Sequence, residues 1–121
     1  MQKKDRITLG CRAEDLARGH LLQEKYDILQ QNFRCPLGEL DFICRKDNYY
    51  VIIEVKSKRG HYFGSPAMMV TKAKQRTIRK VTQYFLKQKG ISLDSNIRFD
   101  VIAIIFANET DIEFEHIIAA F

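Results

Sequence analysis

Hydrophobic and polar positions along the chain first follow a helical period and then the period of a strand. From Leu9 to Lys25 apolar residues recur at helical spacing, and Thr8 is placed to cap the start of such a helix. The segment from Tyr26 to Phe33 contains Tyr-Asp-Ile-Leu and favours a strand. The pattern therefore predicts an N-terminal amphipathic helix followed by a first strand.

A β-hairpin is predicted next, from about Glu39 to Ser57, with its turn at Asp47-Asn48. One face of this hairpin is apolar throughout and should pack beneath a helix layer. That face consists of Leu40, Phe42, Cys44, Val51, Ile53 and Val55. The other face is apolar near the turn, at Ile43 and Ile52, and charged at its open end. The charged residues are Glu39, Asp41, Glu54 and Lys56. Such a gradient is typical of the floor of a pocket.

A second helix is predicted between Ser65-Pro66, a favourable start, and Gly90, a favourable stop. Its expected apolar stripe consists of Val70, Ala73, Thr77, Ile78, Val81, Tyr84 and Phe85. Lys74 lies at the edge of this stripe. A lysine in that position either extends along the surface to reach water or points into a site.

The C-terminal part of the chain predicts two more strands. Arg98 to Phe106 is almost continuously apolar, as in an interior strand covered on both faces. Ile112 to Ile118 alternates between apolar and polar residues and should lie nearer an edge. The complete order is helix, three strands, helix, two strands, which predicts an α/β fold with a mixed sheet flanked by helices.

Composition is that of one globular domain spanning residues 1–121. The chain is 45% hydrophobic and 29% charged, and no Pro/Gly/Ser-rich linker or repeat divides it. The formal net charge is +5, which favours a polyanionic partner without requiring one.

Cysteine content and apolar runs indicate a soluble, cytoplasmic protein with no membrane partner. Cys11, Cys35 and Cys44 show no CxxC spacing, so we expect idle thiols in a reducing compartment and neither a disulfide framework nor a zinc site. No apolar stretch of signal-peptide length follows the N-terminus. The longest apolar run, from Val101 to Ala107, is far shorter than the roughly 20 residues of a membrane-spanning helix.

The charged end of the hairpin is the strongest candidate for chemistry. Folding the chain at Asp47-Asn48 places Asp41 opposite Glu54, with the two carboxylates about 5 Å apart. Such a pair is destabilising unless a cation lies between them, and a divalent metal ion is the usual one. Lys56 follows on the same face, since side chains of a strand alternate. Alone, this triplet also fits solvated surface charges.

Several short blocks along the chain together resemble one family. They are Gly10 through Glu14, Asn32-Phe-Arg34, Gly38-Glu-Leu-Asp41, Glu54-Val-Lys56, Phe63-Gly64, Lys74-Gln75, Arg98-Phe-Asp100 and Ala120-Phe121. In this order they are similar to the YraN family of small bacterial proteins. That family belongs to the PD-(D/E)XK nuclease superfamily and has a likeness to archaeal Holliday-junction resolvases. The resemblance implies a restriction-endonuclease-like core of order αβββαββ.

The resemblance also implies roles for individual residues. Asp41 and Glu54 match the acids that bind Mg²⁺ or Mn²⁺, and Lys56 matches the catalytic lysine. Glu14 matches a glutamate of the first helix that joins the catalytic and metal-binding set. We therefore expect a metal-dependent endonuclease that acts on DNA, branched or otherwise structured, in repair or recombination.

Other functions and assembly states stay open. One alternative is a nucleic-acid-binding module of the same fold with little or no catalytic activity. A second is an interaction protein whose acids serve only structure. Because resolvase-like relatives work as dimers, a homodimer is among the expected states, although the apolar C-terminal end can equally complete the core.

A set of basic and polar residues is expected to contact DNA: Arg34, Lys58, Arg59, Lys72, Lys74, Gln75, Arg76 and Arg79. A basic run of this kind also fits a solvated face. For Arg34 and Arg98 two roles stay open, binding of phosphate or pairing with acids such as Asp100. The aromatic residues at 61–63 are available to stack on bases. His20 and His116 lie on apolar faces and are expected to be packed.

Overall fold

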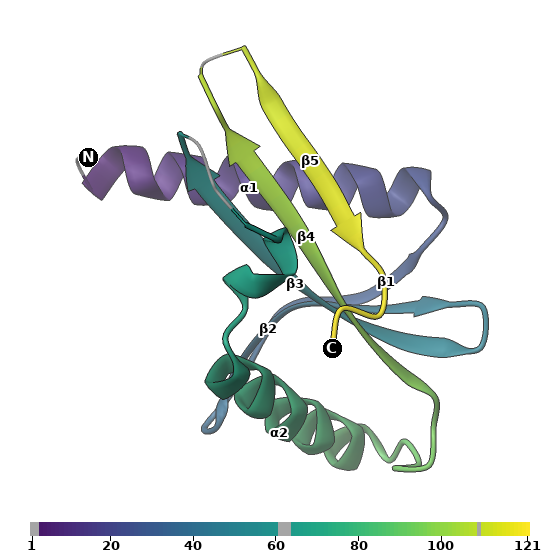
Figure 1. Ribbon diagram of the computed structural model, residues 1–121. Helices are drawn as coiled ribbons and strands as arrows, with labels where there is room; N and C mark the ends of the chain where they lie inside the picture. Colours follow the sequence, from purple (N-terminus) through teal and green to yellow (C-terminus); the bar gives the residue numbers. More distant parts are fainter. Residues whose placement is uncertain (1–2, 61–63, 109) are drawn as a thin grey trace.

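The computed structural model describes residues 3–60, 64–108 and 110–121 (Figure 1). Its elements are α1 (Lys3–Gln23), β1 (Asp27–Cys35), β2 (Gly38–Lys46), β3 (Tyr49–Arg59), the 3-10 helix η1 (Pro66–Met69), α2 (Lys72–Lys89), β4 (Ile97–Phe106) and β5 (Ile112–Ile117). Neither α1 nor α2 is long and apolar enough to cross a membrane.

The five strands form one mixed sheet in the order β1-β2-β3-β4-β5. Every neighbouring pair is antiparallel except β3 and β4, which run parallel. A parallel pair requires a long crossover connection, and here η1 and α2 provide it. The predicted α/β class with a mixed sheet flanked by helices is confirmed, as are the interior position of β4 and the edge position of β5.

Two helices cover opposite faces of the sheet. In Figure 1, α1 (purple) passes behind the strands, whereas α2 (green) lies below and in front of them. The core on the α1 side includes Ala13, Ala17, Leu21, Phe42, Ile53 and Ile102. The core on the α2 side includes Phe33, Leu40, Ile43, Ile78, Phe85 and Val101. Strands buried on both faces explain why β4 is apolar at nearly every position.

The hairpin of β2 and β3 has the predicted register, but only as far as Phe42, which pairs with Ile53. Before Phe42, β2 pairs with β1 alone, and Leu40 lies opposite Phe33. The prediction that Leu40 shares the face of Phe42 is wrong, because Leu40 packs in the α2-side core. Strand alternation is therefore broken at Asp41, where the two strands separate.

The predicted starts of both helices are also wrong. Thr8 lies inside α1, which begins at Lys3. Ser65-Pro66 precedes only η1, and the cap of α2 is Thr71, whose Oγ1 accepts a hydrogen bond from Lys74 N at 3.1 Å. Between η1 and α2, Val70 is extended and 2% exposed, so its packing in the core prevents one continuous helix from Pro66. Gly90, with φ of 67°, ends α2 as predicted.

Because α2 starts after Val70, its buried stripe is rotated from the predicted one. Ile78, Val81 and Phe85 are buried as expected. Ala73 and Tyr84 are exposed, and Thr82 and Leu86 are buried in their place. Residues 66–70, which form η1 and the extended Val70, do not follow the α-helical period of 3.6 residues. The buried face of α2 therefore cannot be extrapolated from Val70.

A buried ionic network ties β4 to the C-terminal end of the chain. Arg98 donates two hydrogen bonds to Asp100, at 3.0 and 2.9 Å, and His116 on β5 approaches the same carboxylate at 2.8 Å. The backbone N–H of Ala119 donates a fourth bond at 3.0 Å. Arg98 also donates to Tyr26 Oη at 2.7 Å. Of the alternatives for Arg98, the structure therefore shows pairing with Asp100.

Asp100 is fully buried, and these bonds compensate its charge. Burial alone would raise the pKa of Asp100, but the hydrogen bonds from His116, Arg98 and Ala119 outweigh it and hold the pKa below the ordinary value of 3.8. The folded protein therefore favours the ionised form of Asp100.

The three cysteines are free thiols, as expected: Cys11 is exposed, Cys35 half-buried and Cys44 buried. Burial raises the pKa of the Cys44 thiol to about 12. A thiol that stays protonated is a poor nucleophile, so Cys44 serves packing.

Asp100→Asn should lower the free energy of unfolding by about 3 to 5 kcal/mol, because it leaves Arg98 without its buried partner. Since the folded pKa lies below the unfolded one, the contribution of Asp100 is present above pH 3.8 and is lost as the pH falls through the lower folded value. Urea denaturation at pH 7 measures the loss. The matched control is Asp94→Asn on an exposed loop, and an equally small effect of both substitutions would contradict the assignment.

Candidate functional site

Asp41 lies where β2 separates from β3. Its Oδ2 accepts a hydrogen bond from the backbone N–H of Val55 at 2.8 Å. Because a strand's N–H groups point in the plane of the sheet toward the neighbouring strand, this bond holds the carboxylate in the opening between β2 and β3. From there it can interact with groups on both faces of the sheet.

Glu54 lies beside Asp41 in this opening, close enough for the Asp41 carboxyl to perturb the pKa of Glu54. Glu54 is only 7% exposed. Burial and then the charge of Asp41 raise the pKa of Glu54 to about 7, against the lowering effect of nearby lysines. The pKa of Asp41 is raised as well, chiefly by burial and by the charges of Glu14 and Glu39. Burial therefore favours the protonated forms of both carboxyl groups.

Two lysines approach the same oxygen of Glu54. Lys56 Nζ on β3 lies 3.8 Å from Glu54 Oε1, and Lys74 Nζ on α2 lies 3.9 Å from it. The alternative left open for Lys74 is thereby resolved, since its ammonium group points to the acids. One lysine comes from the strand and the other from the crossover helix, so the site depends on the packing of α2.

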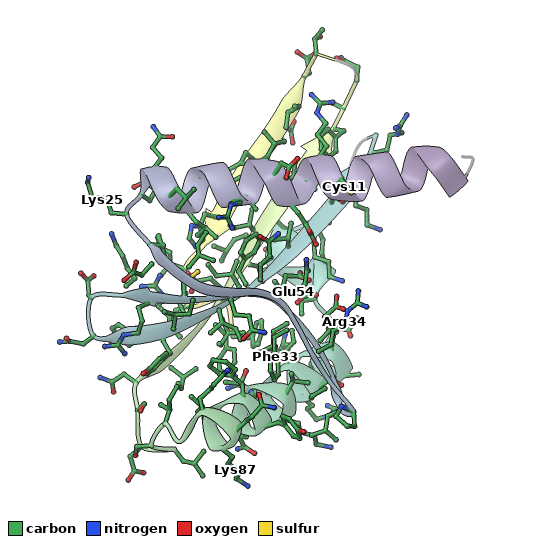
Figure 2. The ribbon with its side chains drawn as sticks, turned by 180° about the vertical axis from the view of Figure 1, so that it is seen from behind. Cys11, Lys25, Phe33, Arg34, Glu54 and Lys87 are labelled. Carbon is green, nitrogen blue, oxygen red and sulfur yellow. The ribbon has the colours of Figure 1, made fainter. Side chains whose placement is uncertain are left out.

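Glu14 reaches the edge of the site from α1. Its Oε2 accepts long hydrogen bonds from Gln31 Nε2 at 3.4 Å and Asn32 Nδ2 at 3.5 Å. Its charge contributes to the raised pKa of Asp41. Figure 2 shows Glu54 between the two helices from which Glu14 and Lys74 come. Glu14 therefore lies beside the acid pair, held there by polar side chains of β1.

The chemistry of the Asp41–Glu54 pair fits a divalent cation. Over the described ranges, no group of three or more His, Cys, Asp or Glu side chains could hold a metal ion. Two carboxylates are nevertheless enough for Mg²⁺, which commonly keeps several waters. Protonation relieves the repulsion between two neighbouring acids, and a cation between them would relieve it in the same way.

Of the residues expected to contact DNA, the structure brings Lys74 to the acids and gives the others different surroundings. Arg34 pairs with Glu39 at 2.6 Å, and Gln75 Nε2 donates to Val70 O at 3.2 Å. The guanidinium of Arg79 lies 4.6 Å from the centre of the Phe99 ring. Four others are exposed on α2 or at the end of β3: Lys72, Arg76, Lys58 and Arg59. His61, Tyr62 and Phe63 lie outside the described residues.

The polar groups that hold the acids in place were missed at the level of sequence. Gln31 and Asn32 hold Glu14, and the Val55 N–H holds Asp41. Asn32 has a positive φ of 55°, a conformation that Asn adopts more readily than most residues. Its place in a family block was a signal, but only strand pairing could reveal the contact with Glu14.

Glu54→Gln should raise the free energy of unfolding by roughly 1 to 3 kcal/mol at pH 8 in the presence of a chelator. The folded pKa of about 7 exceeds the ordinary 4.5, so ionisation of Glu54 destabilises the fold as the pH rises from 4.5 through 7. Glutamine keeps a donor toward Asp41 without the charge. Thermal denaturation from pH 4 to 8 measures the difference, which should vanish at the acid end. Glu113→Gln, at an exposed position on β5, should have little effect at any pH.

Comparison with known proteins extends to nearly the whole chain. The model of the uncharacterised protein family UPF0102 matches residues 13–104. A UPF0102 protein of Geobacter sulfurreducens is 44% identical over 113 residues, which cover 93% of this chain and 88% of that protein. A UPF0102 protein of Thermodesulfovibrio yellowstonii is 41% identical over 116 residues, which cover 96% and 97%. The chain therefore belongs to the UPF0102 family, the YraN family that its sequence blocks indicated.

Proposed function

We propose that this protein is a metal-dependent endonuclease that hydrolyses phosphodiester bonds in DNA, including branched or otherwise structured DNA. The observation that carries the proposal is the carboxyl pair of Asp41 and Glu54 in the opening of the sheet, with the ammonium groups of Lys56 and Lys74 at 3.8 and 3.9 Å from one oxygen of Glu54. Paired acids and cations at one point are what phosphodiester hydrolysis requires. A role in DNA repair or recombination follows from such a substrate.

The fold supports this proposal through the position of the acids. The proposed core is restriction-endonuclease-like, with Asp41 and Glu54 on two strands of a mixed sheet between two helices. The acids lie where β2 separates from β3, so neither carboxyl is enclosed between two paired strands. The order of helices and strands along the chain agrees with the one expected for this core.

Asp41 and Glu54 would hold Mg²⁺ or Mn²⁺, and Glu14, whose charge acts on Asp41, is the third acid of the proposed set. When bound, the ion supplies Lewis acidity toward the phosphate and activates a water. Lys56, on the same strand as Glu54, would orient the attacking water and offset charge on the phosphate oxygens. Lys74 approaches from α2 and would bind the phosphate itself. Both lysines would exchange their contact with Glu54 for contact with substrate.

The exposed face of α2 would provide part of the DNA-binding surface. Lys72 and Arg76 are exposed in its first turns, next to Lys74. The first turn of α2 contains no acidic residue that would repel phosphate. Lys58 and Arg59 at the end of β3 would extend the same surface.

The central prediction concerns cleavage. Four-way junctions, flaps, single strands and linear duplex are incubated with the protein and Mg²⁺ or Mn²⁺. We expect metal-dependent products on at least one substrate, abolished by Asp41→Asn and reduced about 10²- to 10⁴-fold by Lys56→Ala. Lys87→Ala, in the last turn of α2, is the matched control and should leave the rate unchanged.

The outcomes separate the functions considered. If the protein cleaves none of these substrates in the presence of either metal ion, the proposal of a nuclease is wrong. Binding of the same DNA without cleavage would then favour a nucleic-acid-binding module of this fold. Absence of both binding and cleavage would leave the acids with a structural role.

A second prediction concerns the binding surface on α2. Replacing Lys72 and Arg76 together by alanine should weaken DNA binding about equally for all sequences. It should also reduce the slope of log affinity against log salt concentration by about 0.7 to 0.9 for each phosphate that the variant no longer neutralises. The matched control replaces Lys87 and Lys89 at the other end of the helix. Equal slopes for the two double variants would exclude the first turns of α2 from the interface.

A further inference from the structure

A pair of histidines joins α1 to β5 on the α1 face of the sheet. His20 Nε2, from the last turn of α1, lies 2.9 Å from His116 Nδ1 on β5. His116 has only 9% of its side chain exposed, whereas His20 is partly exposed. The proposed nuclease function uses neither residue.

The buried Asp100 orients one of these rings. His116 Nε2 lies 2.8 Å from Asp100 Oδ2, and an ionised carboxylate only accepts hydrogen bonds. His116 must therefore carry a proton on Nε2. In the neutral ring this leaves a lone pair on Nδ1, which faces His20. A histidine held by a carboxylate through one nitrogen, with the other free to bind, is the usual arrangement of a metal-ligating histidine.

We propose that His20 and His116 form a binding site for a divalent transition-metal ion of the kind that imidazole binds, such as Zn²⁺, Ni²⁺ or Cu²⁺. His20 Nε2 and His116 Nδ1 are the two protein ligands, and Asp100 positions His116. The site is distinct from the Asp41–Glu54 pair, whose carboxylates would bind a harder ion such as Mg²⁺.

The two rings are spaced for such an ion. Their centres lie 5.1 Å apart, and their planes are inclined at 75°. Metal–nitrogen bonds of about 2.0 to 2.1 Å at a tetrahedral angle place two imidazole centres about 5 Å apart. To bind the ion, the two rings would therefore rotate so that both nitrogens face it, while the distance between the ring centres stays nearly the same. His20 transfers its proton from Nε2 to Nδ1, so the ion binds two neutral imidazoles without a net release of protons from them.

The surroundings of His20 provide access for the ion and for water. An opening beside His20 is lined by Asp15, Leu16, Gly19, Gln23 and Phe114. Burial and then His116 lower the pKa of His20, against the raising effect of Glu24, so its neutral form is favoured. Water would fill the remaining coordination positions, so we expect weaker binding than at a four-ligand structural zinc site.

The sheet separates this site from the acid pair. His116 pairs with Ile102, a member of the α1-side core, whereas Glu54 contacts Lys74 from α2. An ion at the histidines would bridge the last turn of α1 to the edge strand β5. Because the unfolded chain does not hold the two rings together, binding would stabilise the fold.

Thermal denaturation of tag-free, chelator-treated protein tests the site. The background variant is Asp41→Asn/Glu54→Gln, so that the acid pair does not contribute. At ten times the dissociation constant, Zn²⁺, Ni²⁺ or Cu²⁺ should raise Tm by about 4 °C or more. Adding His20→Gln should remove this rise. His20 is changed and not His116, because His116 also bonds the buried Asp100 and its replacement would disturb the fold.

His61→Gln, which removes the third histidine of the chain, is the matched control and should keep the full rise. The ring-proton NMR resonances of His20 and His116 should shift or broaden on addition of Zn²⁺, and those of His61 should not. Two results would overturn the proposal: no rise in Tm with any of the three ions at 1 mM, on the order of a thousand times a micromolar dissociation constant, or an equal rise in His20→Gln. In either case the two histidines only tie α1 to β5 by a hydrogen bond.

Discussion

The parallel pairing of β3 with β4 is the constraint on which the rest of the structure depends. It extends over the whole of β4, from Ile97 beside Tyr50 to Phe106 beside Arg59. Parallel strands cannot be joined by a tight turn, so the chain has to leave the sheet and return through α2. That crossover covers one face, α1 covers the other, and Lys74 reaches Glu54 only because α2 packs where it does.

The fold shifts the pKa values of two buried acids, Asp100 and Glu54, in opposite directions. Asp100 accepts four hydrogen bonds, and its pKa is held below the ordinary value, so its charge strengthens the fold. Glu54 lies beside another acid, and its pKa is raised, so its charge weakens the fold. A buried acid whose charge weakens the fold is a candidate for function, which is why Glu54 and not Asp100 enters the proposed site.

Much of the fold could be predicted from sequence periodicity, and the errors concern particular positions. The hairpin register, the interior β4, the edge strand β5 and the end of α2 at Gly90 followed from local patterns. Leu40 was misplaced because its position is decided by packing against α2, and Thr8 because α1 already begins at Lys3. Val70 is the clearest case: its burial in an extended conformation delays α2 and rotates the helix's buried face.

The sequence by itself determined the chemistry that is available at the candidate site. Strand alternation around one turn predicted Asp41, Glu54 and Lys56 as one group, although alternation breaks at Asp41 in the structure, and the family blocks added Glu14. Tertiary structure decided how these groups meet: Asp41 lies in an opening of the sheet, bonded to Val55 N–H, and Lys74 arrives from another layer. The pairing of His20 with His116 likewise joins the end of α1 to the last strand. Sequence patterns report which face of an element is buried, whereas contacts between elements depend on the packing of the whole chain.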